Sequence, residues 1–302
     1  MTKHAQAVDL RLPSIADISL DADTLDPQRA AAIYQEHGCL VVRRLMRPHL
    51  AAVRQDLDAA LAEAYHAMDT ATPVAEGWQG ADGTLFIPAP SSFGRERQIM
   101  VLGMRYQTSA ALLRSALDPA ALSVVGAVLG PDVELFQSGQ CLVKEAVGGH
   151  PKNLHQDAAY FEHRFEGPMA VLSYAVDTDG SNGALHVVPG SHRLGMLEHI
   201  DTSSHLALDS ANWPWQRSLP ICGQAGDSIF FHVRTIHGSR PNHSAAPRPV
   251  FIHRYRRPGD YVTVSGTSTA NRGSAHAGAD DSQRGIMVLG RRSHTTAEGD
   301  KA

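Results

Sequence analysis

The sequence predicts a mainly β fold with flanking helices, and three observations support this class. After Gly130-Pro131, short apolar runs such as MAVLSYAVD and VFIHRY alternate with Gly, Pro, Asn and Asp. This spacing favours antiparallel strands of a sandwich or barrel. Before that point the chain is rich in Ala and Leu at helical spacing. The length of 302 residues and the hydrophobic share of 43% suit one large core, because barrels with added helices reach this size as single domains.

The first third of the chain is predicted to be largely helical. The segment PQRAAAIYQEH, from Pro27 to His37, begins with proline and is followed by Gly38, a residue that commonly ends a helix. The segment CLVVRRL follows as a short strand. From Pro48 to Met68, apolar residues recur every three or four positions. We therefore expect a second helix whose apolar face packs against the sheet.

The remaining segments complete the predicted domain. Residues 71–108 are expected to be mostly loop with short strands such as RQIMVLGMRY, because glycine and proline interrupt any period. A helix from Ala110 to Leu129 closes the helical part, about 27–129, and the barrel core covers about 130–260. The tail, 266–302, is rich in Ser, Thr, Ala, Gly and Asp. We expect it to be partly disordered, outside a single domain of residues 1–265.

Composition argues against several functions. The 27 basic and 31 acidic side chains give a net charge of -4, with no broad basic surface, so we expect no nucleic-acid partner. No stretch approaches the roughly 20 apolar residues that span a bilayer, so neither a membrane anchor nor a signal peptide is expected. The cysteines Cys39, Cys141 and Cys222 are widely spaced among apolar neighbours. We interpret them as buried, reduced thiols and expect a cytoplasmic protein.

Two short segments carry candidate metal ligands. In KNLHQDAAYF, His155 and Asp157 are two residues apart, so an extended strand would direct both side chains to one face. In a later segment, GDSIFFHVRTIHGS, His237 lies at the end of an apolar strand. Two histidines and one carboxylate form the facial triad that binds non-haem Fe(II) and leaves positions open for other ligands.

A cation follows the second segment. Arg248 lies eleven positions beyond His237, and RPNHSAAP between them is a plausible reversal of the chain. A turn near Asn242-His243 would place the two residues opposite each other on neighbouring strands. A guanidinium there could bind the far carboxylate of a dicarboxylic co-substrate bidentately. Ser239 is two residues from His237 and would share its face of the strand, so its hydroxyl could bind the same carboxylate.

The prolines around this cation bear on its role. Pro247 and Pro249 flank Arg248, and proline removes donors from a β ladder, so we expect this strand to be unpaired or at an edge. Arg240 and Arg254 are therefore rivals for the same task. The interval of eleven residues favours Arg248.

These motifs resemble the phytanoyl-CoA dioxygenase family of Fe(II)- and 2-oxoglutarate-dependent oxygenases, over roughly residues 27 to 260. The resemblance rests on EHGCLVVRRLM, LHQDAAYF, NGALHVVPGSHRLG, GDSIFFHVRTIHGS and Arg248. Their combination is far more specific than an HxD pair alone. It implies a double-stranded β-helix, a jelly-roll barrel of the cupin type, with the active site in its mouth. It also implies Fe(II), 2-oxoglutarate and O2, and a small-molecule substrate.

The resemblance assigns roles to individual residues. His155, Asp157 and His237 would bind the iron, and Arg248 would bind the distal carboxylate of 2-oxoglutarate. Other expected 2-oxoglutarate contacts are Ser239, Ser173 and Gln140. Candidate substrate contacts, with local packing as the alternative, are Arg105, Tyr106, Phe161, Trp213 and Trp215.

The expected reaction is hydroxylation of a small-molecule or natural-product intermediate with release of succinate and CO2. Related halogenases carry Ala or Gly where this chain has Asp157, which favours hydroxylation. Desaturation, epimerisation and ring closure use the same cofactor chemistry and stay open. So does a cupin-like metalloenzyme that does not use 2-oxoglutarate, which would have no need of Arg248 and Ser239. A non-catalytic binding protein is a third class, and it would tolerate loss of Asp157.

Overall fold

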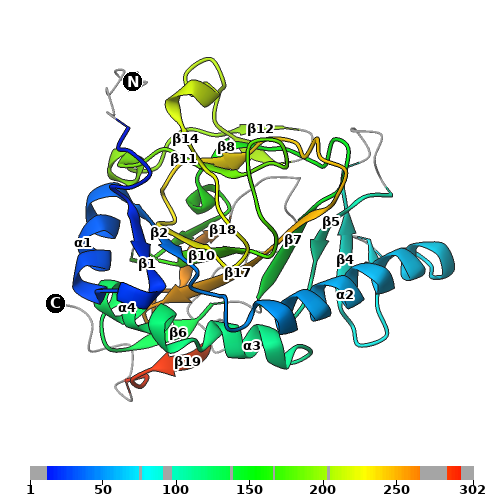
Figure 1. The fold of residues 1–302 in the computed structure, drawn as a ribbon, viewed down its shortest axis with the longest axis horizontal. Helices are drawn as coiled ribbons and strands as arrows, with labels where there is room; N and C mark the ends of the chain where they lie inside the picture. Colours follow the sequence, from blue (N-terminus) through cyan, green and yellow to red (C-terminus); the bar gives the residue numbers. More distant parts are fainter. Residues whose placement is uncertain are drawn as a thin grey trace.

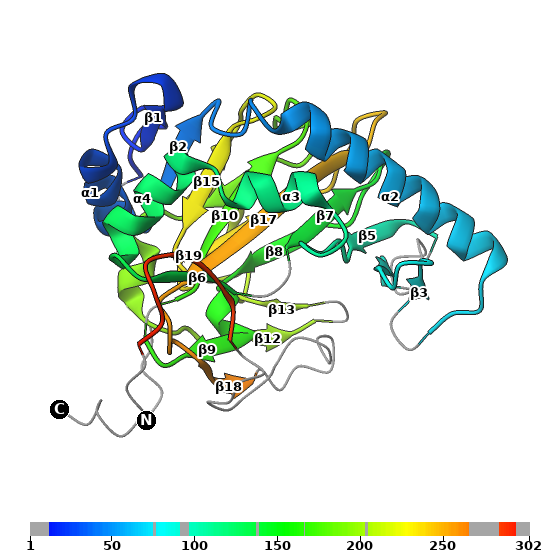
Figure 2. The ribbon, with the colours of Figure 1, turned by 90° about the horizontal axis from the view of Figure 1, so that it is seen from below.

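Two facing sheets and a layer of helices make up the fold, as the sequence predicts. The computed structural model describes residues 12–74, 77–90, 97–136, 139–165, 167–202, 205–265 and 284–293. An eleven-stranded sheet and a four-stranded sheet enclose a shared core, and the helices cover the other face of the larger sheet (Figures 1 and 2).

The large sheet has the strand order β1-β2-β15-β10-β17-β7-β5-β4-β3, with β6 beside β17 and β19 beside β6. Its pairing is antiparallel except between β1 and β2. Its strands are β1 (Ser19–Asp21), β2 (Cys39–Arg43), β3 (Trp78–Gln79), β4 (Leu85–Pro88), β5 (Ile99–Leu102), β6 (Val133–Leu135), β7 (Gln140–Lys144), β10 (Met169–Tyr174), β15 (Ser228–Phe231), β17 (Arg248–Arg256) and β19 (Ile286–Leu289).

The small sheet has the order β14-β11-β16-β8. Its strands are β8 (Lys152–His155), β11 (Leu185–Val187), β14 (Leu219–Ile221) and β16 (His237–Ser239). Two further ribbons pair β9 (Phe161–His163) with β18 (Val262–Ser265), and β12 (Ile200–Asp201) with β13 (Leu206–Ala207).

The helices are α1 (Pro27–His37), α2 (Leu50–Thr70), α3 (Ala110–Ala116) and α4 (Pro119–Leu129). The bounds of α1 are those predicted: Asp26 caps its first turn, and Gly38 adopts a left-handed conformation after its last residue. The single helix predicted over 110–129 is wrong, because the chain breaks between α3 and α4. Residues before a proline avoid the helical region, and the Asp118 side chain instead caps α4 by accepting a hydrogen bond from the amide of Ala121.

The central strands of the large sheet are buried on both faces. On β17, Phe251 and Tyr255 belong to the core under the helices, whereas Val250 and Ile252 belong to the core between the sheets. Successive side chains of a strand alternate between faces. The parity of a residue on these strands therefore decides whether its side chain can reach the space between the sheets.

The position of β17 corrects one prediction. Arg248 and Pro249 pair with β7, and from Val250 onward the strand also pairs with β10, so β17 is central and not an edge. The prolines are tolerated because they lie before and at the start of the strand, where few ladder bonds are lost.

Two further predictions need correction. Residues 284–293 fall in the predicted tail, yet they contain β19, which pairs with β6 and extends the large sheet beyond residue 265. The other tail residues, 266–283 and 294–302, lie outside the described residues. Cys39 and Cys141 are buried as predicted, but Cys222 is exposed, because it directly follows β14 at the edge of the small sheet.

In the described part of the chain, the only candidate for a membrane-spanning segment is α3 and α4 taken together, a pair bent by 47°; neither they nor any other single helix is long and apolar enough alone.

A buried histidine under the helices predicts acid sensitivity. The His253 ring lies 3.0 Å from the hydroxyls of both Tyr106 and Ser115, and burial lowers its pKa from 6.5 to about 3. Below pH 6.5 the unfolded chain therefore binds a proton that the folded chain excludes. We expect this residue alone to lower the free energy of unfolding by about 1.4 kcal/mol per pH unit between pH 6.5 and 3.

Urea unfolding of the native chain and of His253→Gln at pH 7 and pH 5.5 tests this expectation. The variant should lose less stability on acidification than the native chain, by about 1.4 kcal/mol per pH unit. Equal losses in the two proteins would contradict it.

Candidate metal centre

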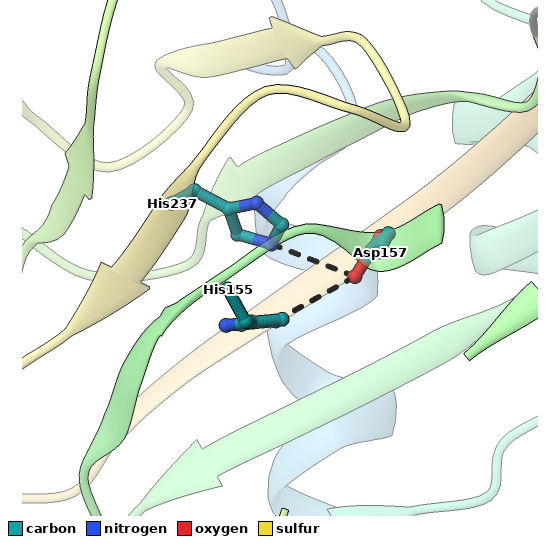
Figure 3. Close-up of side chains that lie close together, drawn as sticks. All are labelled: His155, Asp157 and His237. Atoms are coloured by element: carbon teal, nitrogen blue, oxygen red, sulfur yellow. Dashed lines mark ion pairs between the residues drawn. The ribbon is translucent and has the colours of Figure 1, made fainter. Parts of the chain in front are cut away.

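The three predicted metal ligands meet at the end of the small sheet. His155 is the last residue of β8 and His237 the first residue of β16, and the two are cross-strand partners. Asp157 begins a single helical turn, Asp157–Ala159, so it lies just beyond the strand that was expected to carry it. Gln156 between them is still extended. Figure 3 shows the three side chains converging from these segments.

The distances suit a shared ion. Oδ1 of Asp157 lies 3.7 Å from Nε2 of His155 and 3.5 Å from Nε2 of His237. These separations exceed a normal hydrogen bond. One donor atom from each residue lies within 4.8 Å of the others, and all three residues are buried. One small ion can therefore contact all three atoms.

The backbone fixes which imidazole nitrogen faces the ion. Nδ1 of His155 donates a hydrogen bond of 2.8 Å to the carbonyl of Asn153, and Nδ1 of His237 donates one of 2.9 Å to the carbonyl of Thr235. Each proton is thereby held on Nδ1, which leaves the lone pair of Nε2 for a metal. This arrangement is typical of histidine ligands in metalloproteins.

The charge states also suit a metal. Burial, together with the nearby His237, lowers the pKa of His155 to about 4. Burial alone would raise the pKa of Asp157, but His237, His155 and Arg254 together hold it well below 3.8. At neutral pH the site thus offers a neutral imidazole at His155 and a carboxylate at Asp157, the forms that bind Fe(II).

Gln156 anchors the segment between two ligands, a role that the sequence did not reveal. Its side chain donates to the carbonyls of Gly195 and Arg234 and accepts from the amide of Leu197. Its own amide donates to Nε2 of His199. The residue between the ligands is therefore fully hydrogen-bonded, and it holds their positions.

Arg254 contacts the second oxygen of the carboxylate. Its Nη2 lies 3.6 Å from Oδ2 of Asp157, and its Nη1 donates a hydrogen bond of 2.9 Å to Oε1 of Gln140. Its guanidinium also lies 5.9 Å from the centre of the Phe161 ring. Gln140 and Phe161 are therefore close to the centre. Arg254 leaves Oδ1 directed at the two histidines.

We expect Arg254→Met to lower the affinity of the centre for Fe(II) about 10- to 100-fold, the usual effect of removing a partner of a ligand. Methionine keeps most of the buried volume but removes the charge beside Oδ2. Competition with a coloured chelator under anaerobic conditions measures the affinity. Arg240→Met is the matched control, since Arg240 is exposed and lies over Trp215. Equal affinities in the two variants would contradict the expectation.

Arg248 and Ser239 also face the space between the sheets. Arg248 lies on the same face of β17 as Val250, and Ser239 pairs with Leu185. Val250 and Leu185 belong to the core between the sheets. Arg248 is only 4% exposed, donates to the carbonyl of Gly183, and burial lowers its pKa to about 10. It therefore remains charged, and among the described residues no carboxylate pairs with it.

The route of the chain between His237 and Arg248 differs from the prediction. The two residues do not lie on neighbouring strands, because β16 belongs to the small sheet and β17 to the large one. Asn242 directs the crossing: its side chain donates to the carbonyls of Lys144 and Ala246. The chain thus passes from one sheet to the other, and the two residues approach the interior from opposite sides.

A known family model matches most of the chain, including the segments that carry the triad. The family model described as Phytanoyl-CoA dioxygenase (PhyH) matches residues 34–250. The chain belongs to this family. The match confirms the predicted phytanoyl-CoA dioxygenase family.

Two relatives of this family member are named as a dioxygenase and a hydroxylase. The probable alpha-ketoglutarate-dependent hypophosphite dioxygenase of Stutzerimonas stutzeri is 32% identical over 142 residues, 40% of this chain and 49% of the relative. The methylphosphonate hydroxylase of Gimesia maris is 31% identical over 125 residues, 41% of this chain and 45% of the relative. This chain thus matches about half the length of these relatives.

A solved structure shows the shared fold. The non-heme alpha ketoglutarate dependent carbocyclase SnoK from nogalamycin biosynthesis superposes with a TM-score of 0.60 at 19% identity, covering 84% of this chain and 91% of that one. The predicted double-stranded β-helix is confirmed.

One predicted 2-oxoglutarate contact does not face the centre. Ser173 lies on the side of β10 that faces the helices, with its hydroxyl 2.8 Å from that of Ser228. Its neighbours Leu172 and Tyr174 point between the sheets instead. A slip of one residue in the strand alignment exchanges the two faces, which explains the error.

Four of the five predicted substrate contacts also lie elsewhere. Tyr106 is part of the core under the helices, and Arg105 is exposed. Trp213 and Trp215 pack with Leu154 and Ile236, residues that neighbour the ligands in sequence but lie outside the core between the sheets. Both tryptophans therefore have local packing partners.

Proposed function

We propose that this family member is an Fe(II)- and 2-oxoglutarate-dependent dioxygenase that hydroxylates a small molecule. The observation that carries the proposal is the convergence of Nε2 of His155, Nε2 of His237 and Oδ1 of Asp157 on one buried point. When bound there, Fe(II) and 2-oxoglutarate supply the oxidation of a substrate C–H bond by O2, with succinate and CO2 as co-products.

The chain's own residues hold and shield the reacting groups. His155, Asp157 and His237 hold the iron, and Arg254 keeps the carboxylate oriented. Arg248 and Ser239 hold the far carboxylate of 2-oxoglutarate from inside the barrel, and Gln140 supports Arg254. Because these groups are largely buried, bulk water is excluded from the site.

The buried Arg248 argues against a metalloenzyme that does not use 2-oxoglutarate. Its guanidinium is 4% exposed, and in the described part of the chain its hydrogen-bond partners are the carbonyls of Asn182 and Gly183. Burying such a charge is costly unless an anion pairs with it. The far carboxylate of 2-oxoglutarate provides that anion. The names of the two relatives, which refer to hypophosphite and methylphosphonate, support a small-molecule substrate. Free thiols at Cys39, Cys141 and Cys222 support a cytoplasmic location.

Succinate formation from 2-oxoglutarate tests the proposal. The purified chain should release succinate slowly without substrate, only when Fe(II) and O2 are both present, and faster when a true substrate is added. Isotopically labelled O2 should leave one labelled oxygen atom in succinate and, for a hydroxylase, one in the product. A product without labelled oxygen would instead indicate desaturation, epimerisation or ring closure. Absence of iron-dependent succinate would overturn the proposal.

A further inference from the structure

The space between the sheets contains an excess of positive charge on three buried side chains and one half-buried side chain. Arg248 and Arg254 share the inward face of β17, and Lys144 shares that of β7 with Leu142. Lys152 pairs with Ser239 and so shares its inward face. In the described part of the chain, the acidic side chains on these inward faces are Asp157 and Glu134. Glu134 is already paired with Arg256 and Arg292.

The charges do not balance when the cofactors are added. With Glu134 and its two arginine partners set aside, the other four cations and the carboxylate of Asp157 leave a net charge of +3. Fe(II) and the 2-oxoglutarate dianion together are neutral, so their binding does not change this sum. Burial, with Arg248 and Lys152 nearby, lowers the pKa of Lys144 well below 10.5; counting Lys144 as neutral still leaves +2. Buried charge of this size needs a further anion.

Lys152 is the cation without an assigned partner. Arg254 contacts Asp157 and Gln140, Lys144 donates to the carbonyl of His150, and Arg248 is assigned to 2-oxoglutarate. Within the described ranges, the Lys152 ammonium makes no hydrogen bond or ion pair. Burial lowers the pKa of Lys152 to about 8, so the group is still mostly protonated at pH 7.

The strand geometry explains how Lys152 reaches the interior. Lys152 and His155 are three residues apart, so a regular strand would direct them to opposite faces. The pairing of β8 with β16 shifts by one residue between His237 and Ser239, which is a β-bulge. The bulge turns Lys152 to the same side as His155. Such bulges often re-aim a side chain beside an active site.

We infer that Lys152 binds an anionic group of the primary substrate, and that this substrate is a small molecule carrying an oxyanion, such as a phosphonate, sulfonate or carboxylate. The inference rests on the proposed function, because the charge balance includes iron and 2-oxoglutarate. It deepens that function by naming the substrate class and the residue that selects it.

Three tetrahedral probes of similar size separate charge from shape: methylphosphonate, methanesulfonate and neutral dimethyl sulfone. Each is titrated calorimetrically, under anaerobic conditions, into the full chain loaded with Fe(II) and saturating 2-oxoglutarate. We expect the two anions to bind at least 10-fold more tightly than dimethyl sulfone. Equal binding of the neutral probe, or no binding of either anion, would overturn the inference. Loss of anion affinity as 2-oxoglutarate is raised would place the anion on the co-substrate site and also overturn it.

Variants of Lys152 test the assigned residue. Lys152→Gln should lower the affinity for the anions at least 10-fold, and Lys152→Arg should retain it. Arg240→Gln, which removes an exposed cation, should have no effect. If Lys152→Gln fails to fold, Lys152→Arg still tests the inference. Anion binding retained by Lys152→Arg would support the inference, and loss of 2-oxoglutarate binding by Lys152→Arg would contradict it.

Substrate-free succinate formation separates this inference from the proposed function. Lys152→Gln should keep the native KM for 2-oxoglutarate. A KM raised at least 10-fold would show that Lys152 serves the co-substrate, which overturns the inference but leaves the proposed function intact. Absence of succinate from the native chain would overturn the proposed function itself.

Discussion

Replacing His237 with alanine is expected to abolish iron-dependent succinate formation and to lower Fe(II) affinity at least about 100-fold. This loss exceeds the usual effect of changing a residue that only hydrogen-bonds to a metal ligand. The variant keeps Asp157 and His155 but loses one of the three donor atoms that converge on the site. Two remaining donors hold the ion weakly. Anaerobic chelator competition measures the affinity, and 2-oxoglutarate turnover measures the activity.

His186→Ala is the control for this experiment. His186 is also buried and lies on β11, the neighbour of β16, but it packs against Trp215 on the other side of the small sheet. This variant removes an imidazole of similar burial without removing a ligand, so iron affinity should be unchanged. Native iron affinity in His237→Ala would exclude the assigned centre.

Local signals were sufficient for the features that depend on adjacent residues. Asp26, Pro27 and Gly38 mark the two ends of α1, because caps act within one turn of a helix. The HxD pair and His237 lie in short segments that are each recognisable alone, although only the fold brings them together. The helix caps and the motifs can thus be read from a few adjacent residues.

Long-range features could not be predicted in this way. Lys152 has the wrong parity for the interior, and only the bulge opposite β16 turns it inward. A strand's pattern does not reveal a bulge that depends on its partner. Ser173 failed for a related reason, because one residue of register exchanges the faces of β10. Arg254 and Arg248 lie on the same face of β17, so the alternation of side chains along the strand could not decide which of them contacts Asp157.

The turn before Arg248 shows a third kind of limit. The sequence RPNHSAAP is compatible with a tight reversal between paired strands, and that reading placed His237 and Arg248 side by side. Asn242 instead hydrogen-bonds to the carbonyl of Lys144, on a strand far away in sequence. The sheet to which β17 belongs is therefore determined by contacts that form only in the folded chain.

Arg248→Met is expected to raise the KM for 2-oxoglutarate roughly 30- to 1000-fold, since removing one partner of a buried charge pair costs about 2–4 kcal/mol. Methionine fills much of the vacated volume, so the loss reflects charge and hydrogen bonding. Succinate formation at increasing 2-oxoglutarate concentration measures KM. Arg248→Lys should recover part of the affinity only, because an ammonium cannot bind a carboxylate bidentately.

The metal affinity of the same variant decides how its kinetics are interpreted. Arg248 contacts the carbonyl of Gly183 and none of the three ligands, so Arg248→Met should bind Fe(II) as the native chain does. A raised KM with native iron affinity would assign Arg248 to the co-substrate. A raised KM together with weakened iron binding would indicate that the barrel had changed shape. A native KM would indicate that another inward cation binds the far carboxylate of 2-oxoglutarate. Arg240→Met, at the exposed position, should match the native chain in both measurements because Arg240 lies over Trp215 and faces away from the centre.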